Sequence, residues 1–192
     1  MTRGPTDVRT AVVPLEDIFA LRRDVLRPGG PEESARFPED ADPDVFHIAA
    51  CRAGPADEAQ SPAAGPGAAS GGPVLACITF FPDPLPAGAA RVAGLPADGP
   101  AARSAYRFRG MAAAPEVRGQ GFGHAVLEAG LAELRRRGVH VVWCNGRTPA
   151  TPFYERQGFT RVGEEFVLEP AGPHYVFVRD LDGRSRPRSA PP

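Results

Sequence analysis

Arg118-Gly119-Gln120-Gly121-Phe122-Gly123 is the stretch that decides the fold, because it joins two strongly patterned segments. Before it lies an expected strand, Tyr106–Ala114, and after it lies the best helix pattern in the chain, Phe122–Arg137. Glycines at such a junction allow positive φ and let the backbone approach a ligand. The helix beyond offers unpaired N–H groups and the positive end of its dipole. The stretch therefore predicts a strand–turn–helix unit that binds phosphate or pyrophosphate.

Two other interpretations of this turn compete with a site for phosphate or pyrophosphate. A dinucleotide fingerprint needs Gly-x-Gly-x-x-Gly directly after the strand. Here Gly121-Phe122-Gly123-His124-Ala125-Val126 lacks the third glycine, although alanine is sometimes accepted there, and Glu116-Val117-Arg118 lengthen the turn beyond Pro115. The remaining alternative is a helix that opens with glycines for packing alone.

Hydrophobic periodicity predicts the elements around this unit. The expected strands are Asp7–Val13, Val45–Arg52, Val74–Phe81, Val139–Asn145, Thr160–Leu168 and His174–Leu181, and the expected helices are Pro14–Arg27 and Thr151–Gln157. Strand–helix–strand alternation in the second half predicts a parallel crossover, and the first half offers hairpins. The expected fold class is α/β (mixed α+β), with a central mixed, partly parallel sheet and helices on both faces.

Alanine, glycine and proline are concentrated in two stretches, Ala53–Pro73 and Pro82–Arg103. Both have too few large apolar side chains to offset their ordering entropy, so we expect mobile loops there. The tail Gly183–Pro192 is expected to be disordered. The rest, within residues 1–182, has the size of a single domain.

Composition excludes several classes of protein. The formal net charge is −1, which argues against binding nucleic acid or anionic membranes by bulk electrostatics. All 22 basic residues are arginine, so there is no Walker phosphate loop and no lysine base. The three cysteines have no paired zinc spacing, and no metal is expected. Without a membrane span or a signal-peptide core, we expect a cytoplasmic monomer or homodimer.

Three motifs in order resemble the GNAT superfamily of N-acetyltransferases. Met111-Ala112-Ala113-Ala114-Pro115-Glu116-Val117-Arg118-Gly119-Gln120-Gly121-Phe122-Gly123 is similar to the family's Arg/Gln-x-x-Gly-x-Gly/Ala turn. Trp143-Cys144-Asn145-Gly146-Arg147 and Phe153-Tyr154-Glu155-Arg156-Gln157-Gly158-Phe159 follow at the expected spacing. The resemblance covers about Tyr106 to Phe159.

The resemblance implies acetyl-CoA as cosubstrate and assigns roles to particular residues. Backbone groups of Met111, Ala112 and Ala113 would pair with the pantetheine arm. The pyrophosphate would be bound by the amides of Arg118, Gly119, Gln120, Gly121, Phe122, Gly123 and His124. Asn145 would hydrogen-bond pantetheine or substrate, and Tyr154 would protonate the departing thiolate. A phenol, with a pKa of about 10, suits that last role.

The acceptor side of the site is less defined. The strand Tyr106–Ala114 carries no carboxylate, so the candidate bases are Glu164, Glu165, His174 and His47, or a water relay. We expect His47, Arg109 and His174 to contact the acceptor. Arg109, together with Arg107 or Arg147, suggests an acceptor with a carboxylate or phosphate, because arginine forks bind such groups. Cys144 is interpreted as an unreactive core thiol.

The resulting hypothesis is an N-acetyltransferase that acts on a primary amine, expected to be a small molecule, by direct transfer. A non-catalytic acyl-CoA-binding sensor or partner domain would keep the phosphate turn without the chemistry. A dinucleotide-dependent oxidoreductase is disfavoured by the length of the turn.

Overall fold

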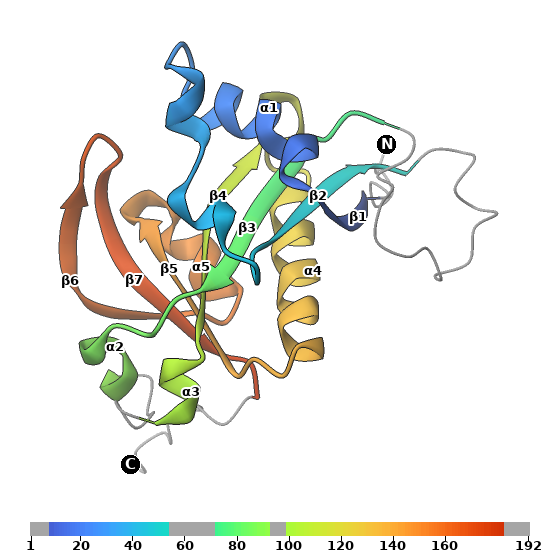
Figure 1. Cartoon of the computed structure of the whole chain (residues 1–192). Coiled ribbons are helices and arrows are strands. Elements are labelled where there is room, and N and C mark those ends of the chain that lie inside the picture. The colour runs from blue at the N-terminus through green and yellow to red at the C-terminus, as the bar shows by residue number, and fades with distance from the viewer. Residues whose placement is uncertain (1–7, 54–71, 93–98, 183–192) are drawn as a thin grey trace, which may run out of the picture. The chain divides into compact units, whose positions relative to one another are not determined.

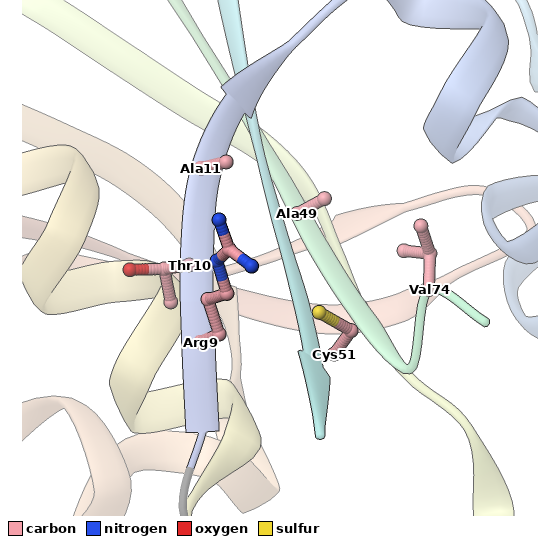
Figure 2. A pocket seen from close by; sticks show the side chains of 6 residues that line it. All are labelled: Arg9, Thr10, Ala11, Ala49, Cys51 and Val74. Carbon is pink, nitrogen blue, oxygen red and sulfur yellow. The ribbon is translucent and has the colours of Figure 1, made fainter. Parts of the chain in front are cut away.

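The computed structural model describes residues 8–53, 72–92 and 99–182 (Figure 1). The chain forms two compact units. Unit 1 comprises Met1–Phe81 and Arg109–Glu133, and unit 2 comprises Pro82–Phe108 and Leu134–Pro192. Strand β4 (Tyr106–Ala113) and helix α4 (Phe122–Arg136) each contribute residues to both units.

Seven strands form a mixed sheet in the order β1-β2-β3-β4-β5-β7-β6. Besides β4 they are β1 (Val8–Val13), β2 (Phe46–Arg52), β3 (Ala76–Pro82), β5 (Val141–Arg147), β6 (Thr160–Leu168) and β7 (Gly172–Asp180). Strand β4 pairs in parallel with β5, whereas β1 with β2, β2 with β3, β5 with β7 and β6 with β7 are antiparallel. The predicted fold class is confirmed, and the ends of every predicted element agree within two residues.

In unit 1, helices pack on both faces of the strands. Helix α1 (Leu15–Leu26) buries Ile18 against a cluster that includes Ala49 and Cys77. The neighbouring residues on β2 and β3 point to the other face, as side chains alternate along a strand. There Phe80 packs against Gly130 of α4 so closely that a Cβ would collide with its ring.

Unit 2 follows the same plan with shorter helices. On one face, Trp143 and Val178 pack against α2 (Ala87–Val92) and α3 (Pro100–Arg103). The opposite face carries Cys144 and Phe177, and it contacts α5 (Thr151–Arg156). Figure 1 shows β6 and β7 as a long curved hairpin.

The stretch Pro82–Arg103 is predicted to be a mobile loop, and the structure shows two short helices there. It contains α2 and α3, and it buries small side chains beside one large one, namely Leu85, Ala89, Ala90 and Ala102. Alanines let these short helices approach Trp143 closely, so the stretch needs few large apolar residues of its own. Residues 93–98, residues 54–71 of the other predicted loop and the tail 183–192 lie outside the described residues. Among the described helices, none has the length and apolarity to cross a membrane.

Candidate active site

The glycine-rich turn lies in unit 1, between the 3-10 helix η4 (Pro115–Val117) and α4. Gly119 and Gly121 have φ of +74° and +88°, a region in which other residues are strained. A Cβ on either residue, or on Gly123, would meet no further heavy atom within 4 Å. At Gly119 and Gly121, glycine is therefore required by the path of the backbone. Close packing does not account for them, and the space above the turn is open.

The turn leads directly into the N-terminus of α4. Phe122 is fully buried and anchors the first turn, and the Ala125 N–H donates to the Gly121 carbonyl at 2.9 Å. The first N–H groups of a helix have no partner within the helix, and the dipole is positive at that end. The predicted pyrophosphate-binding residues thus form one continuous segment, in which Arg118 and His124 are exposed.

Sequence reasoning missed one cation beside this turn. Arg52, at the end of β2, is exposed, and its Nη2 donates to Oε1 of Gln120 at 3.3 Å. Its guanidinium carbon lies 5.6 Å from the centroid of the Phe122 ring. The sequence shows Arg52 only as the last residue of a strand, and nothing in its pattern reveals the turn as its neighbour.

Met111, Ala112 and Ala113 end β4 just before the turn. Ala112 packs into the core cluster under α1, while Met111 and Ala113 are half-buried. The Ala113 carbonyl accepts a long hydrogen bond, 3.4 Å, from Nε of Arg118. Small side chains leave the backbone accessible to an extended ligand, and the pantetheine role of this segment stays a prediction.

Arg109 lies two residues before Met111 and forms an ion pair with Glu39 of the 3-10 helix η2 (Pro38–Ala41). Its Nη1 is 3.1 Å from both carboxylate oxygens, and its guanidinium carbon lies 3.9 Å from the centroid of the Phe37 ring. Gly110 allows this arrangement, because a Cβ there would lie 2.7 Å from the Phe37 ring.

His47 belongs to a buried polar network under α1. Its Nδ1 lies 2.9 Å from Oγ1 of Thr79 and 3.5 Å from Nη2 of Arg22. Arg22 is fully buried and pairs with Asp40, with 2.7 Å between Nη1 and Oδ2. Burial, reinforced by Arg22, lowers the pKa of His47 to about 4, so the ring is neutral at physiological pH. These partners fix the imidazole, and its contact with an acceptor stays a prediction.

Tyr154, the predicted proton donor, lies in α5 of unit 2 and is 7% exposed. Its ring packs on Phe177, with centroids 4.7 Å apart, and on Phe108 and Phe159 at 6.1 and 6.0 Å. Its hydroxyl forms a hydrogen bond with the Cys144 thiol. Burial, followed by the effect of Cys144, raises the pKa of Tyr154 well above its ordinary value. The phenol therefore keeps the proton that a donor must hold.

Gly146 and Cys144, on either side of Asn145, determine where the Tyr154 ring lies. A Cβ on Gly146 would collide with that ring and would lie 2.7 Å from the Phe177 ring, so only glycine fits. Cys144 is buried, and burial raises the pKa of its thiol far above the ordinary range. Cys144 is thus a protonated core thiol, as the sequence suggested.

The structure does not bring Asn145 and Tyr154 to the same face of the strands. Cys144 contacts Tyr154 and directly precedes Asn145, and successive side chains on a strand point to opposite faces. Asn145, half-buried, instead shares its face with Trp143 and the α2–α3 cluster. The Tyr154 ring and the Asn145 side chain therefore lie on opposite faces of β5, and the catalytic role of each stays a prediction.

His174 shares the face of Asn145, because it is the cross-strand neighbour of Arg147. It is 5% exposed, and its Nδ1 lies 2.7 Å from the Gly172 carbonyl. A carbonyl can only accept, so Nδ1 carries a hydrogen. Nε2 is therefore the ring nitrogen left to serve as a base.

The remaining predicted polar residues of unit 2 are more exposed or already engaged. Glu164 and Glu165 are exposed on β6, where Glu165 accepts a hydrogen bond from Thr148 at 2.7 Å. Arg107 pairs with Asp83 at 3.3 Å, and its guanidinium carbon lies 4.7 Å from the Trp143 ring. In the described part of the chain, no three His, Cys, Asp or Glu side chains are arranged to hold a metal ion.

Solved structures of other proteins share this mixed fold. Escherichia coli ElaA has a TM-score of 0.62 and 14% identity, covering 90% of this chain and 99% of that chain. An acyl-CoA N-acyltransferase from Pseudomonas aeruginosa has a TM-score of 0.58 and 21% identity, with coverage of 90% and 98%.

The sequence pattern of the acetyltransferase (GNAT) family matches residues 31–159, so the chain belongs to this family. An uncharacterized N-acetyltransferase of Bacillus subtilis, YitI, is 26% identical over 169 residues, covering 88% of this chain and 93% of the relative. The resemblance inferred from the three motifs is therefore confirmed. The protein is a GNAT N-acetyltransferase, an enzyme class that uses an acyl-CoA donor and an acceptor substrate.

Proposed function

We propose that the protein transfers an acetyl group from acetyl-CoA to a primary amine of a small molecule, by direct transfer. The observation that carries this proposal is the turn at Gly119 and Gly121, where positive φ, open space and a helix N-terminus coincide. Acetyl-CoA fits this site because its phosphates are the anions that such amides bind.

The residues proposed to hold acetyl-CoA in unit 1 come from the glycine turn, the end of β4 and the end of β2. Amides of Arg118 through His124 would bind the pyrophosphate, and Arg52 would add a second guanidinium beside Gln120. Backbone groups of Met111 to Ala113 would pair with the pantetheine arm. Arginine suits the phosphates because its planar fork forms charge-assisted hydrogen bonds, and the chain has no lysine to take this role.

The chemistry requires the chain to take one proton from the acceptor amine and to give one to sulfur. Acetyl-CoA supplies the acetyl group in activated form, as a thioester. Tyr154 holds a phenol proton and would donate it to the thiolate, and Nε2 of His174 would accept the amine proton. Asn145, on the His174 face, would hydrogen-bond substrate or pantetheine. Direct transfer is favoured because the Cys144 thiol is buried and stays protonated, so it is unsuited to carry the acetyl group.

Two measurements test this proposal in sequence. Acetyl-CoA and CoA should raise the melting temperature of the protein, and NAD or NADP should not. Release of free thiol with a panel of amines should then separate an enzyme from a non-catalytic acyl-CoA sensor. A melting temperature that no CoA species raises would overturn the proposal. If acetyl-CoA stabilises the protein but no amine causes release of CoA thiol, the non-catalytic sensor is favoured.

A further inference from the structure

We propose that Glu39 and Arg109 together recognise the acceptor, and that the acceptor is an amine that also carries a carboxylate, as amino acids do. In this arrangement Arg109 binds the carboxylate of the acceptor and Glu39 accepts hydrogen bonds from its amine. The inference rests on the proposed function, because it names the acceptor class of that reaction.

The Glu39–Arg109 pair belongs to unit 1. Arg109 lies on β4, two residues before Met111, where the segment proposed to pair with pantetheine begins. Two residues of a strand span at most about 7 Å, so Arg109 lies within the length of a small amino acid from that segment. Glu39 reaches this part of β4 from η2, and its carboxylate is 3.1 Å from Arg109. Opposite charges are thus held together beside the proposed donor segment.

Contacts other than this ion pair also hold η2 in position. Asp40 accepts hydrogen bonds from the buried Arg22 at 2.7 Å and from the Phe37 N–H at 2.8 Å. The Phe37 ring also fits against Gly110, where a Cβ would collide with it. The Arg22 contact holds η2 on α1, and the Phe37 ring holds it on β4, so the neighbouring Glu39–Arg109 pair is not the only contact that positions η2.

The two ion pairs of this region differ in solvent exposure. The side chains of Arg109 and Glu39 are 33% and 25% exposed, whereas those of Arg22 and Asp40 are 0% and 6% exposed. A partly exposed pair in contact with water can exchange partners at little cost, and a buried pair cannot. An amine with a carboxylate offers each member of the Glu39–Arg109 pair a new partner of opposite charge. Phe37, stacked under the Arg109 guanidinium, keeps that group oriented during the exchange.

The test uses the full chain, acetyl-CoA and three matched probes: phenylalanine, phenylalaninamide and phenethylamine. All three have the amine, but only phenylalanine has the carboxylate. The wild-type protein should show a kcat/KM for phenylalanine at least about tenfold above that for either other probe. If phenylalanine itself does not fit, alanine with alaninamide and glutamate with its α-amide serve as the matched pairs. Equal rates within every matched pair would overturn the inference.

The single variants separate the two proposed contacts. Arg109→Gln should raise KM for the carboxylate-bearing probe by about tenfold and change KM for the amide by less than about twofold. Glu39→Gln should raise KM for both probes, because both carry the amine. Arg23→Gln is the matched control, since it breaks the exposed Arg23–Asp24 pair of α1 and should leave the ratio between probes unchanged. Equal losses for both probes in Arg109→Gln would overturn the inference.

A charge exchange distinguishes recognition from a structural role. The double variant Glu39→Arg with Arg109→Glu can re-form an ion pair, so a purely structural pair would regain the wild-type melting temperature and activity. If the pair recognises the acceptor, the double variant should recover the melting temperature but not the preference for the carboxylate. The positive and negative side chains have then exchanged places relative to the acetyl group. If wild type releases CoA thiol with some amine and the exchange variant fully regains that activity, the acceptor inference is contradicted and the proposed function is not. If no amine causes release of CoA thiol, the proposed function is contradicted as well.

Discussion

Tyr154 shows how burial and chemistry combine in a single residue. Its phenol stays protonated because an aromatic cluster disfavours the phenolate, and its ring fits only because residue 146 is glycine. Tyr154→Phe keeps the ring and removes the proton, so kcat should fall about 100-fold or more while the Kd for acetyl-CoA stays within about threefold. Steady-state thiol release and a binding titration measure the two quantities.

Tyr175→Phe is the matched control for this substitution, because Tyr175 makes an edge contact with the same Phe177 ring. It should leave kcat unchanged. A Tyr154→Phe enzyme that turns over at the wild-type rate would remove Tyr154 from the mechanism.

The buried His47 should make the stability of the folded protein depend on pH. Its pKa is lowered to about 4 in the folded protein, from an ordinary value of 6.5, so between these values the unfolded chain binds more protons than the folded one. Stability should therefore rise from pH 4 to pH 6.5 and be level above it, with His47 contributing at most about 3 kcal/mol. Urea unfolding of wild type and His47→Gln across this range measures the contribution.

The difference between the two proteins isolates His47 from other acid-sensitive groups. Wild type should lose stability toward pH 4 more steeply than the variant. Parallel pH profiles would show that the imidazole is not buried in its neutral form.

Individual residues also show where sequence reasoning ends. Arg22 could be placed on the apolar side of its helix from periodicity, but its partner Asp40 is 18 positions away and follows a connector without a pattern. The glycine at 146 reads as an ordinary strand residue until the Tyr154 ring is placed against it. Partners of this kind depend on how elements meet, which one sequence does not encode locally.

At the scale of elements, helix propensity and core packing have opposite effects at Gly130 of α4. Alanine is favoured over glycine inside a helix by about 1 kcal/mol. At Gly130, however, an added Cβ would collide with the Phe80 ring of β3, and overpacking a core costs about 1–3 kcal/mol. Gly130→Ala should therefore lower the free energy of unfolding, as measured by urea denaturation.

Gly88→Ala in α2 is the control, since a Cβ there meets nothing within 4 Å. It should be neutral or raise the free energy of unfolding by up to about 1 kcal/mol. A stabilised Gly130→Ala protein would mean that α4 can move away from β3.

The turn and its neighbouring strand make the second prediction at this scale. Arg52 extends the positive charge of the α4 N-terminus through its contact with Gln120. Arg52→Ala should raise the Kd for acetyl-CoA about fivefold to tenfold and weaken its salt dependence, because one charge-assisted contact is lost. Titration at two salt concentrations measures both effects.

Arg36→Ala serves as the control here, because Arg36 also lies over a phenylalanine ring, that of Phe19, but is not in the turn. Its Kd should match that of wild type. An unchanged Kd in Arg52→Ala would leave the turn amides and Arg118 as the phosphate site.

Long, strongly patterned elements were predictable, and short alanine-rich helices were not. The stripe of Leu127, Leu131 and Leu134 predicts α4 by its spacing alone, and all three are fully buried. Helices α2 and α3 have no such stripe, since Ala89, Ala90 and Ala102 bury little area each and depend on the large Trp143 ring across the core. The loop prediction for Pro82–Arg103 counted large apolar residues within the stretch and could not include those supplied by β5.

At the scale of the whole molecule, the two compact units share continuous elements. Strand β4 passes from unit 2 to unit 1 at Phe108–Arg109, and helix α4 returns at Glu133–Leu134. Unfolding of one unit therefore removes part of a strand and part of a helix from the other. This predicts one cooperative transition, consistent with the single domain expected from chain length.

Two spectroscopic probes can test this cooperativity because they report on different units. Trp143 is the only tryptophan and is 5% exposed in unit 2, so its fluorescence follows that unit. Far-UV circular dichroism is dominated by α1 and α4, which lie wholly or mostly in unit 1. In urea the two signals should have the same midpoint, and Gly130→Ala, in unit 1, should shift the Trp143 midpoint as far as the dichroism midpoint. Separate midpoints, or a shift confined to one signal, would show that the units unfold independently.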